Sequence, residues 1–253
     1  MIDRDIFFNT VRPSLFGGSL SQSQVDGMNY LLDVWETFFE GPNPRDGNKW
    51  LAYCMATVFH ETGKKMTPVK ENGGKPYGNP PGKYWTACGP YNNVYYGRGH
   101  VQLTWDTNYQ KGQDQLKKNY GVDVPLYQYP DKMLNDEPSA LVLYDGMTIG
   151  WFTGVGLPKY FNATVEDPIN ARRVVNGTDK AQTIAGYYWK FKDAIVTAPT
   201  PAPEPEPEPE PEPAPPLELP TLSLTITCDQ QINVVINGTP LGVLIGNVED
   251  SDG

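Results

Sequence analysis

Two segments, WLAYCMATVFHETG (Trp50–Gly63) and YYGRGHVQLTWDTNY (Tyr95–Tyr109), decide how the rest of this sequence is interpreted. The first predicts a helix over residues 48–62 with apolar residues on almost all its sides, so we expect that helix to be central and buried. Gly63 is a helix stop signal. The helix therefore ends on a carboxylate, Glu61, and a second carboxylate, Glu71, follows on the glycine-rich segment KENGGK.

Residues 63–94 connect the two segments and are rich in Gly, Pro, Lys and Tyr. A connection this long inside a compact domain is usually functional or disordered, and its aromatic residues favour a cleft wall or lid. The GRG sequence at 97–99 indicates a tight backbone passage, and residues 101–103 are expected to be short and extended. Thr104 is placed to cap a helix from Trp105 to about Tyr120.

The remaining periodic segments predict a mainly α domain over residues 1–198 with long loops. Ser21 or Ser23 can cap the first of these helices, and Asn135 or Asp136 can cap another that has Pro138 in its first turn. The expected helices cover residues 20–40, 136–152, 168–177 (short) and 181–196.

The composition changes at residue 199. Residues 199–216 alternate Pro with Glu, a pattern that favours an extended linker because it cannot bury a core. Residues 217–253 contain β-rich runs, and Asn237-Gly238 is a strong hairpin signal. This small β-rich C-terminal module is too short for a robust core of its own. We predict that it mediates self-association or nothing essential.

The net charge of −10 belongs to the tail. Residues 1–199 contain all 20 Lys and Arg and 20 of the 30 Asp and Glu, whereas residues 200–253 contain the other 10 acids and no basic residue. A nearly neutral folded part argues against nucleic-acid binding. The acidic tail disfavours docking on an anionic surface.

The three cysteines and two histidines match no metal site. Cys54, in the apolar helix, is expected to be a buried free thiol, although a bridge to Cys88 stays open. The sequence HETGK lacks the second histidine of an HExxH zinc motif, and His100 is the only other histidine. We therefore expect no metal and no cofactor.

The N-terminal sequence has charges at Asp3, Arg4 and Asp5 and no long apolar run, which does not fit a secretory signal peptide. No segment approaches the roughly 20 apolar residues that span a bilayer. We expect the protein to be made in the cytoplasm without stable membrane insertion. To act on a cell wall, it would have to be released from the cytoplasm by another agent.

Glu61 and Glu71 can form an acid/base pair. A carboxylate at the C-terminal end of a largely apolar helix meets the negative end of the helix dipole and poor solvation, and both favour its protonated form. Lys70 and Lys75 flank Glu71 and favour its ionised form. Each glutamate alone is explained more simply as a solvated side chain. Asp106 is a backup base, but its place at a helix start explains it better.

The second segment decides the matter, because Tyr95 to Tyr109 resembles the YGRG-x-x-QL-[ST]-x-x-x-NY signature of glycoside hydrolase family 19. HETG at 60–63 resembles the segment of that family with the catalytic acid, and Arg173–Gly177 resembles its later INGG block, with Thr178 in place of one Gly. The blocks occur in the family's order. The chain resembles the compact phage and bacterial branch, which includes endolysins, more than the plant chitinases.

The resemblance implies a lysozyme-like bilobal α-helical fold and a role for each matched residue. Glu61 matches the general acid, Thr104 matches the residue that orients the attacking water, and Glu71 is the base by analogy with the shorter loop of the endolysin-like branch. An Arg near the last helix of plant members has no obvious counterpart here, where Thr183 and Ala185 occupy the region. The residues assigned to substrate binding are His60, Tyr96, Arg98, Gln102, Asn108 and Asn176.

These assignments predict an inverting hydrolase of β-1,4 bonds between N-acetylated amino sugars. The expected partner is a polysaccharide, and peptidoglycan is favoured over chitin because the missing signal peptide fits an endolysin. The alternatives are a bacterial chitinase and a non-catalytic glycan-binding or virion-associated protein on the same fold.

Overall fold

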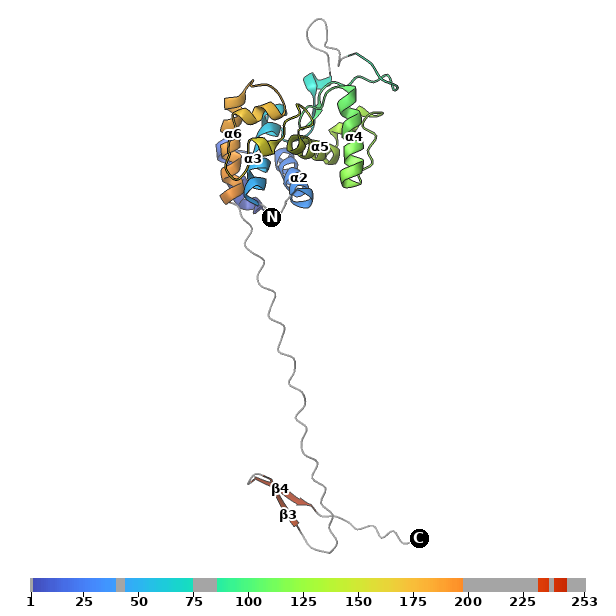
Figure 1. Cartoon of the computed structure of the whole chain (residues 1–253). Coiled ribbons are helices and arrows are strands. Elements are labelled where there is room, and N and C mark those ends of the chain that lie inside the picture. The colour runs from blue at the N-terminus through green and yellow to red at the C-terminus, as the bar shows by residue number, and fades with distance from the viewer. Residues whose placement is uncertain (1, 40–43, 75–85, 198–231, 237–238, 245–253) are drawn as a thin grey trace, which may run out of the picture. The chain divides into compact units, whose positions relative to one another are not determined.

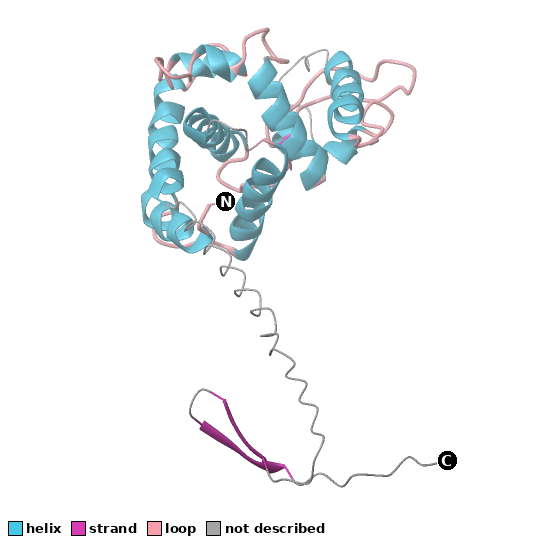
Figure 2. Ribbon diagram, turned by 60° about the horizontal axis from the view of Figure 1, so that its bottom comes forward, coloured by secondary structure: helices cyan, strands magenta, loops and turns pink. Residues whose placement is uncertain are grey.

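The computed structural model of this protein describes residues 2–39, 44–74, 86–197, 232–236 and 239–244 (Figure 1). The chain divides into two compact units, Met1–Ala202 and Pro203–Gly253. Helices dominate the first unit and its strands are very short (Figure 2). The mainly α class predicted from the sequence is therefore confirmed.

The first unit consists of six helices, four short 3-10 helices and two strands among its described residues. The helices are α1 (Arg4–Leu15), α2 (Gln22–Phe38), α3 (Pro44–Glu61), α4 (Asp106–Tyr120), α5 (Asp136–Ile149) and α6 (Ala181–Thr197). The 3-10 helices are η1 (Glu71–Gly74), η3 (Pro130–Leu134), η4 (Leu157–Lys159) and η5 (Asn170–Val174). The strands β1 (Val69–Lys70) and β2 (Arg98–Gly99) pair antiparallel.

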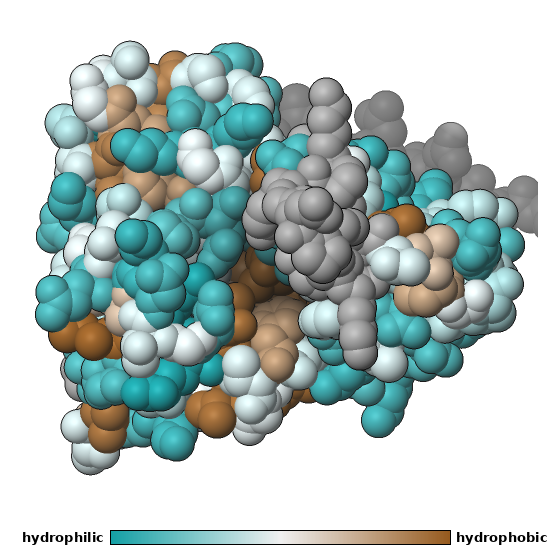
Figure 3. All heavy atoms as spheres, turned by 90° about the horizontal axis from the view of Figure 1, so that it is seen from above, coloured by the Kyte–Doolittle hydropathy of each residue, from teal (hydrophilic) through white to brown (hydrophobic). Residues whose placement is uncertain are grey.

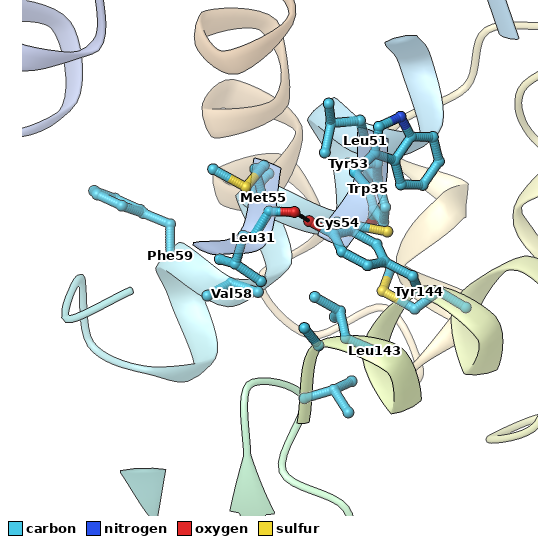
Figure 4. Packing of buried hydrophobic residues seen from close by; sticks show 14 of the residues in the cluster. Leu31, Trp35, Leu51, Tyr53, Cys54, Met55, Val58, Phe59, Leu143 and Tyr144 are labelled. Atoms are coloured by element: carbon cyan, nitrogen blue, oxygen red, sulfur yellow. Dashed lines mark hydrogen bonds between the residues drawn. The ribbon is translucent and has the colours of Figure 1, made fainter. Parts of the chain in front are cut away.

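Two helices are buried almost completely. Every residue of α3 from Leu51 to Phe59 is buried, and so is every residue of α5 from Pro138 to Met147. Figure 4 shows side chains of α3 packed with those of α2 and α5, and the Tyr144 hydroxyl donates a hydrogen bond to the Leu31 carbonyl at 2.9 Å. Burial of each large apolar side chain contributes about 1.5–3 kcal/mol. The prediction of a central, buried α3 is confirmed.

Helix α5 joins the two halves of this unit. It packs against α2 and α3, and also against α4, β2 and η3. We call α1, α3, α6 and η5 the helical half, because α6 packs on each of the other three. We call β1, β2, η1, η3 and α4 the strand half. The rigid, buried α5 therefore fixes one half against the other.

Local signals explain where most helices begin and end. Ser21, one of the two capping candidates in the sequence, caps α2 in a capping box with Gln24. Gly63, with φ of 59°, follows the end of α3, and Gly150 closes α5 in the left-handed conformation. Asn135 occupies the N-cap position of α5, but without a side-chain capping hydrogen bond.

Two local expectations were wrong, and one helix was missed. Helix α4 begins at Asp106, with Trp105 rather than Thr104 at its N-cap position and no side-chain capping bond. Residues 101–103 are not an extended segment but the turn and end of a tight hairpin, in which Arg98 and Leu103 exchange backbone hydrogen bonds. Helix α1 has no counterpart in the sequence-based assignment, because its charged start hid the apolar face of Phe7, Phe8, Val11 and Leu15.

The described thiols are free. Cys54 is buried and Cys88 is exposed, and no disulfide joins them. Burial raises the pKa of the Cys54 thiol well above its ordinary value. The free thiol at Cys54 is confirmed, whereas Cys228 lies outside the described residues.

The second unit is described only at two strands, β3 (Ile232–Ile236) and β4 (Thr239–Leu244). They pair antiparallel, with Ile236 opposite Thr239 and Ile232 opposite Leu244. The linker at 199–216 and the rest of the tail lie outside the described residues. The domain boundaries and self-association through residues 217–253 stay predictions.

A buried imidazole lies where the hairpin of β2 meets α5. His100 has no exposed surface, and its backbone N–H donates to the Ser139 hydroxyl at 2.7 Å. Burial lowers the pKa of His100 from 6.5 to about 3. The unfolded chain therefore takes up a proton below pH 6.5 that the folded chain excludes, so acid favours unfolding.

We expect the free energy of unfolding to fall by up to about 1.4 kcal/mol per pH unit between pH 6.5 and 5, because one proton separates the folded and unfolded states. Urea unfolding at a series of pH values measures this slope. His100→Leu should flatten it, and the control His60→Gln, which leaves the buried imidazole in place, should keep it. An equal slope in wild type and His100→Leu would contradict the assignment.

Candidate active site

The two halves enclose one cleft of about 720 Å³. The face drawn in Figure 3 is hollowed, with hydrophobic residues at the base of the hollow. The helical half contributes Glu61 at the end of α3 and the segment after η5, and the strand half contributes η1, the hairpin turn and the start of α4. Six predicted site residues line the cleft: Glu61, Glu71, Gln102, Thr104, Asn108 and Asn176.

Glu61 is the last residue of α3 and is held by a buried arginine. Arg172 Nη1 donates to Glu61 Oε1 at 2.7 Å, and the exposed side-chain fractions are 5% for Arg172 and 19% for Glu61. Arg172 Nε also donates to the Asp179 carbonyl at 3.2 Å, which fixes the guanidinium. The structure therefore holds the Glu61 carboxyl group at one place on the cleft wall.

Arg172 is the site residue that sequence reasoning missed. It lies on η5, one residue before the RVVNG block, whereas the resemblance implied an arginine near α6. The only sequence signal is the Arg172-Arg173 pair itself, and it does not show which of the two is buried. The structure answers this, since Arg172 is buried and Arg173 is exposed.

Glu71 starts η1 on the strand half, and backbone groups hold it. Its own N–H donates to the Gly97 carbonyl at 2.7 Å, and the Gly97 N–H donates to Glu71 Oε2 at 3.0 Å. A Cβ atom at position 97 would lie 2.9 Å from Gln102 Oε1 and 3.1 Å from Glu71 Oε2. Only glycine fits this place without a shift, which confirms the tight backbone passage predicted for the GRG sequence.

Gln102 ties the hairpin turn to the strand before Glu71. Its Nε2 donates to the Val69 and Gly99 carbonyls, both at 3.0 Å. Gln102 has a positive φ of 56°, and Trp105 has a positive φ of 76°; both are conformations that side chains other than glycine rarely adopt. Such strain gathers at functional sites, where the surrounding structure compensates for it.

Thr104 and Asn108 form a fixed polar wall. The Thr104 hydroxyl donates to the Gln102 carbonyl at 2.9 Å, and Asn108 Nδ2 donates to the Thr104 carbonyl at 2.8 Å. The hydroxyl proton of Thr104 is therefore engaged by the chain, and its oxygen is left to accept a hydrogen bond. Asn176, opposite, is exposed, and its side-chain oxygen accepts from the Gly177 N–H.

Three predicted substrate-binding residues do not line this cleft. His60 is half-buried in the last turn of α3. Tyr96 and Arg98 line a separate hollow with Asp131. Arg98 is buried, and its Nε lies 2.7 Å from Asp131 Oδ1.

Lys70, which the sequence places next to Glu71, contacts a different carboxylate in the structure. The Lys70 ammonium lies 2.8 Å from Asp131 Oδ2. Lys75 lies outside the described residues.

One described aromatic side chain lines the cleft with a large exposed surface. Trp105 is 44% exposed, and Phe152 on the opposite wall is half-buried. Tyr77, Tyr84 and Trp85 lie outside the described residues. Residues 69–72 form part of the cleft wall, as expected for the connection between the two sequence segments.

Within residues 2–39, 44–74 and 86–197 and the two tail strands, no group of three or more His, Cys, Asp or Glu is arranged to hold a metal ion. In the same part of the chain, no helix is long and apolar enough to cross a membrane.

The chain is similar in sequence to a plant chitinase. It is 25% identical over 193 residues to endochitinase A of Zea mays, a match that covers 74% of this chain and 65% of that protein. The chain thus spans about two thirds of the length of this curated relative. No family model matches the chain.

The fold is that of the family 19 chitinases. Chitinase C of Streptomyces griseus HUT6037 superposes with a TM-score of 0.52 at 20% identity, covering 78% of each chain. A bacterial family 19 chitinase superposes with a TM-score of 0.53 at 23% identity, covering 77% of this chain and 94% of that one. The resemblance to glycoside hydrolase family 19 that the sequence motifs indicate is therefore confirmed.

The contacts of Arg172 predict its effect on stability. Arg172→Met should lower the free energy of unfolding by about 1–3 kcal/mol, because the partly buried Glu61 carboxylate and the Asp179 carbonyl both lose their donor. Urea unfolding measures the change. The adjacent, exposed Arg173 is a matched control, and Arg173→Met should change stability by less than about 0.5 kcal/mol. Equal losses in the two variants would contradict the role of Arg172.

Proposed function

We propose that this chain, which shares the fold of the family 19 chitinases, hydrolyses β-1,4 bonds between N-acetylated amino sugars, with Glu61 as general acid and Glu71 as general base. One observation supports this most: the two carboxylates come from opposite halves of the fold and line the same cleft. A pair of carboxyl groups across a cleft is the arrangement that glycoside hydrolysis requires.

In the proposed reaction, the Glu61 carboxyl group protonates the glycosidic oxygen as the bond to the anomeric carbon breaks. Loss of the proton leaves Glu61 negatively charged next to the Arg172 guanidinium, 2.7 Å away. That contact stabilises the product state of the proton transfer. Arg172 is buried and donates two hydrogen bonds, so it needs little rearrangement to stabilise this charge.

The attacking water is activated from the strand half. Glu71 accepts one proton from it, and the Thr104 oxygen accepts a hydrogen bond from its other proton, because the Thr104 hydroxyl proton is already donated to Gln102. The water then directs a lone pair towards the anomeric carbon, on the face opposite the leaving group. The hydrogen bond from the Gly97 N–H keeps the Glu71 carboxylate in one orientation.

Sugar recognition follows from the rest of the lining. The exposed face of Trp105 offers an apolar surface for a sugar ring. Asn108 and Asn176 add amide groups that can bond hydroxyl and N-acetyl groups.

Chitin is the first substrate to test, because the similar proteins are named as chitinases. Peptidoglycan contains the same type of bond between N-acetylated sugars, so the cleft chemistry suits both polymers. The sequence-based preference for peptidoglycan, and with it the role in cell-wall lysis after release from the cytoplasm, stays a prediction.

Glu61→Gln should lower kcat by at least about 10²-fold on the active polymer, because Gln cannot supply the proton. Turnover is measured on chitin, on a soluble chitin oligosaccharide and on purified peptidoglycan. Glu137→Gln, an exposed glutamate of α5, is the control and should keep wild-type activity. Full activity of Glu61→Gln would contradict the assignment. A wild-type chain that binds either polymer and cleaves neither would support a non-catalytic glycan-binding protein.

The stereochemistry of the product tests the role of Glu71. A water activated by Glu71 on the opposite face inverts the anomeric carbon, so the first product of a β-linked oligosaccharide should be the α-anomer. Proton NMR within the first minutes of reaction, before the anomers equilibrate, distinguishes the two. A β-anomer as first product would mean retention and would exclude Glu71 as base.

A further inference from the structure

We propose that Asp131 is a positioning residue for Glu71, and that it acts by binding Lys70 and Arg98 together across the two-stranded sheet that presents the base. The inference rests on the proposed function, since it concerns the same site. Asp131 is not among the residues that line the cleft. Its effect would pass through the sheet.

The first argument is the register of β1 and β2. Lys70 lies directly opposite Arg98 in the antiparallel pair. Opposed side chains lie about 5 Å apart at their Cβ atoms, and like charges in such a pair destabilise it. Asp131 offsets this repulsion with one carboxylate, because Oδ2 lies 2.8 Å from Lys70 Nζ and Oδ1 lies 2.7 Å from Arg98 Nε.

The second argument is the position of the base on the same ladder. Glu71 follows Lys70, and Gly97 precedes Arg98, so the pair of Glu71 and Gly97 comes next along the two segments. That pair makes both the backbone bond of 2.7 Å and the bond from the Gly97 N–H to Glu71 Oε2. A sheet that opens at Lys70 and Arg98 would therefore loosen the orientation of the base.

The third argument is that Asp131 and Arg98 are both fixed. Arg98 is buried, lies 3.6 Å over the ring of Tyr96, and donates through Nη1 to the Val94 and Tyr96 carbonyls and the Tyr109 hydroxyl. Asp131 follows the buried Pro130 on η3. The pair thus ties the sheet to a rigid part of the strand half.

The charge on Asp131 supports this role. Partial burial raises the pKa of Asp131, but hydrogen bonds from Lys70 and Arg98 outweigh that effect, so the pKa lies below its ordinary value. Asp131 is therefore ionised at neutral pH.

A simple surface ion pair is the alternative, because the Asp131 side chain is 59% exposed and exposed pairs contribute little. The chain offers a matched example of such a pair. Lys117 and Asp123 lie 2.7 Å apart, with side chains 64% and 65% exposed. Asp131 differs because one of its partners, Arg98, is only 5% exposed. Asp123→Asn is therefore the control for Asp131→Asn.

Hydrogen–deuterium exchange of the full chain tests the positioning directly. In Asp131→Asn, the Gly97 amide should exchange on the order of 10-fold faster, because its bond to Glu71 opens more often. Amides of α3 should exchange at the wild-type rate, which separates a local effect from a general loss of stability. Asp123→Asn should leave the Gly97 amide unchanged. An unchanged Gly97 amide in Asp131→Asn would overturn the proposal.

Kinetics on a soluble chitin oligosaccharide give the second readout. Asp131→Asn should lower kcat on the order of 10-fold with KM within about two-fold, because the base is misplaced while the sugar contacts remain. Asp123→Asn should stay within about two-fold in both. Equal kinetics for the two variants would overturn the proposal even where Glu61→Gln is inactive. If the proposed function itself fails, Glu61→Gln will keep full activity. The exchange experiment does not depend on that activity.

A second variant covers the case in which Asp131→Asn does not fold. Lys70→Met breaks only the more exposed contact of Asp131 and leaves the pair with Arg98 in place. It should raise Gly97 exchange in the same direction as Asp131→Asn, by a smaller factor. Exchange is the readout for this variant because Lys70 itself lies in the cleft wall, and a wild-type rate would overturn the proposal.

Discussion

The structure depends on one constraint: helix α3 is buried along its length and still has to place a carboxylate at solvent. Leu51 to Phe59 have almost no exposed surface, whereas Glu61, two residues further on, lines the cleft. A charge so close to a core is costly unless it is paired. Arg172 provides the pairing from a separate segment, η5, and thereby also fixes how η5 and Asn176 lie against the end of α3.

The second carboxylate is held in a different way. No long helix positions Glu71; instead, a two-residue strand, a backbone hydrogen bond from Gly97 and the side chain of Gln102 hold it. Such small elements have little stability of their own. Their order comes from packing on α5 and from the polar contacts around Arg98. The proposed acid and base thus belong to two scaffolds of unequal stiffness that are joined by one buried helix.

Sequence reasoning succeeded where a local signal and burial agree. The capping box of Ser21 and the periodic apolar face of α6 place those helices to within a few residues, and the apolar run of α3 identifies the core. It failed where tertiary contacts decide. Threonine is a good N-cap residue, yet the Thr104 hydroxyl donates its hydrogen bond to the Gln102 carbonyl within the turn. Nothing in the chain order shows that Arg172 rather than Arg173 turns inward, or that Lys70 pairs with Asp131.

The left-handed backbone of Gln102 and Trp105 has a consequence for how this protein can change. Replacement of Trp105 by glycine would relieve backbone strain of about 1–3 kcal/mol, whereas replacement of Gln102 would also break its two side-chain hydrogen bonds. Random selection for heat resistance would therefore tend to find the change at Trp105. Each change would also remove a side chain that lines the cleft. At the rim of the cleft, a gain in thermal stability can therefore cost turnover. Variants selected for heat resistance should be screened for activity.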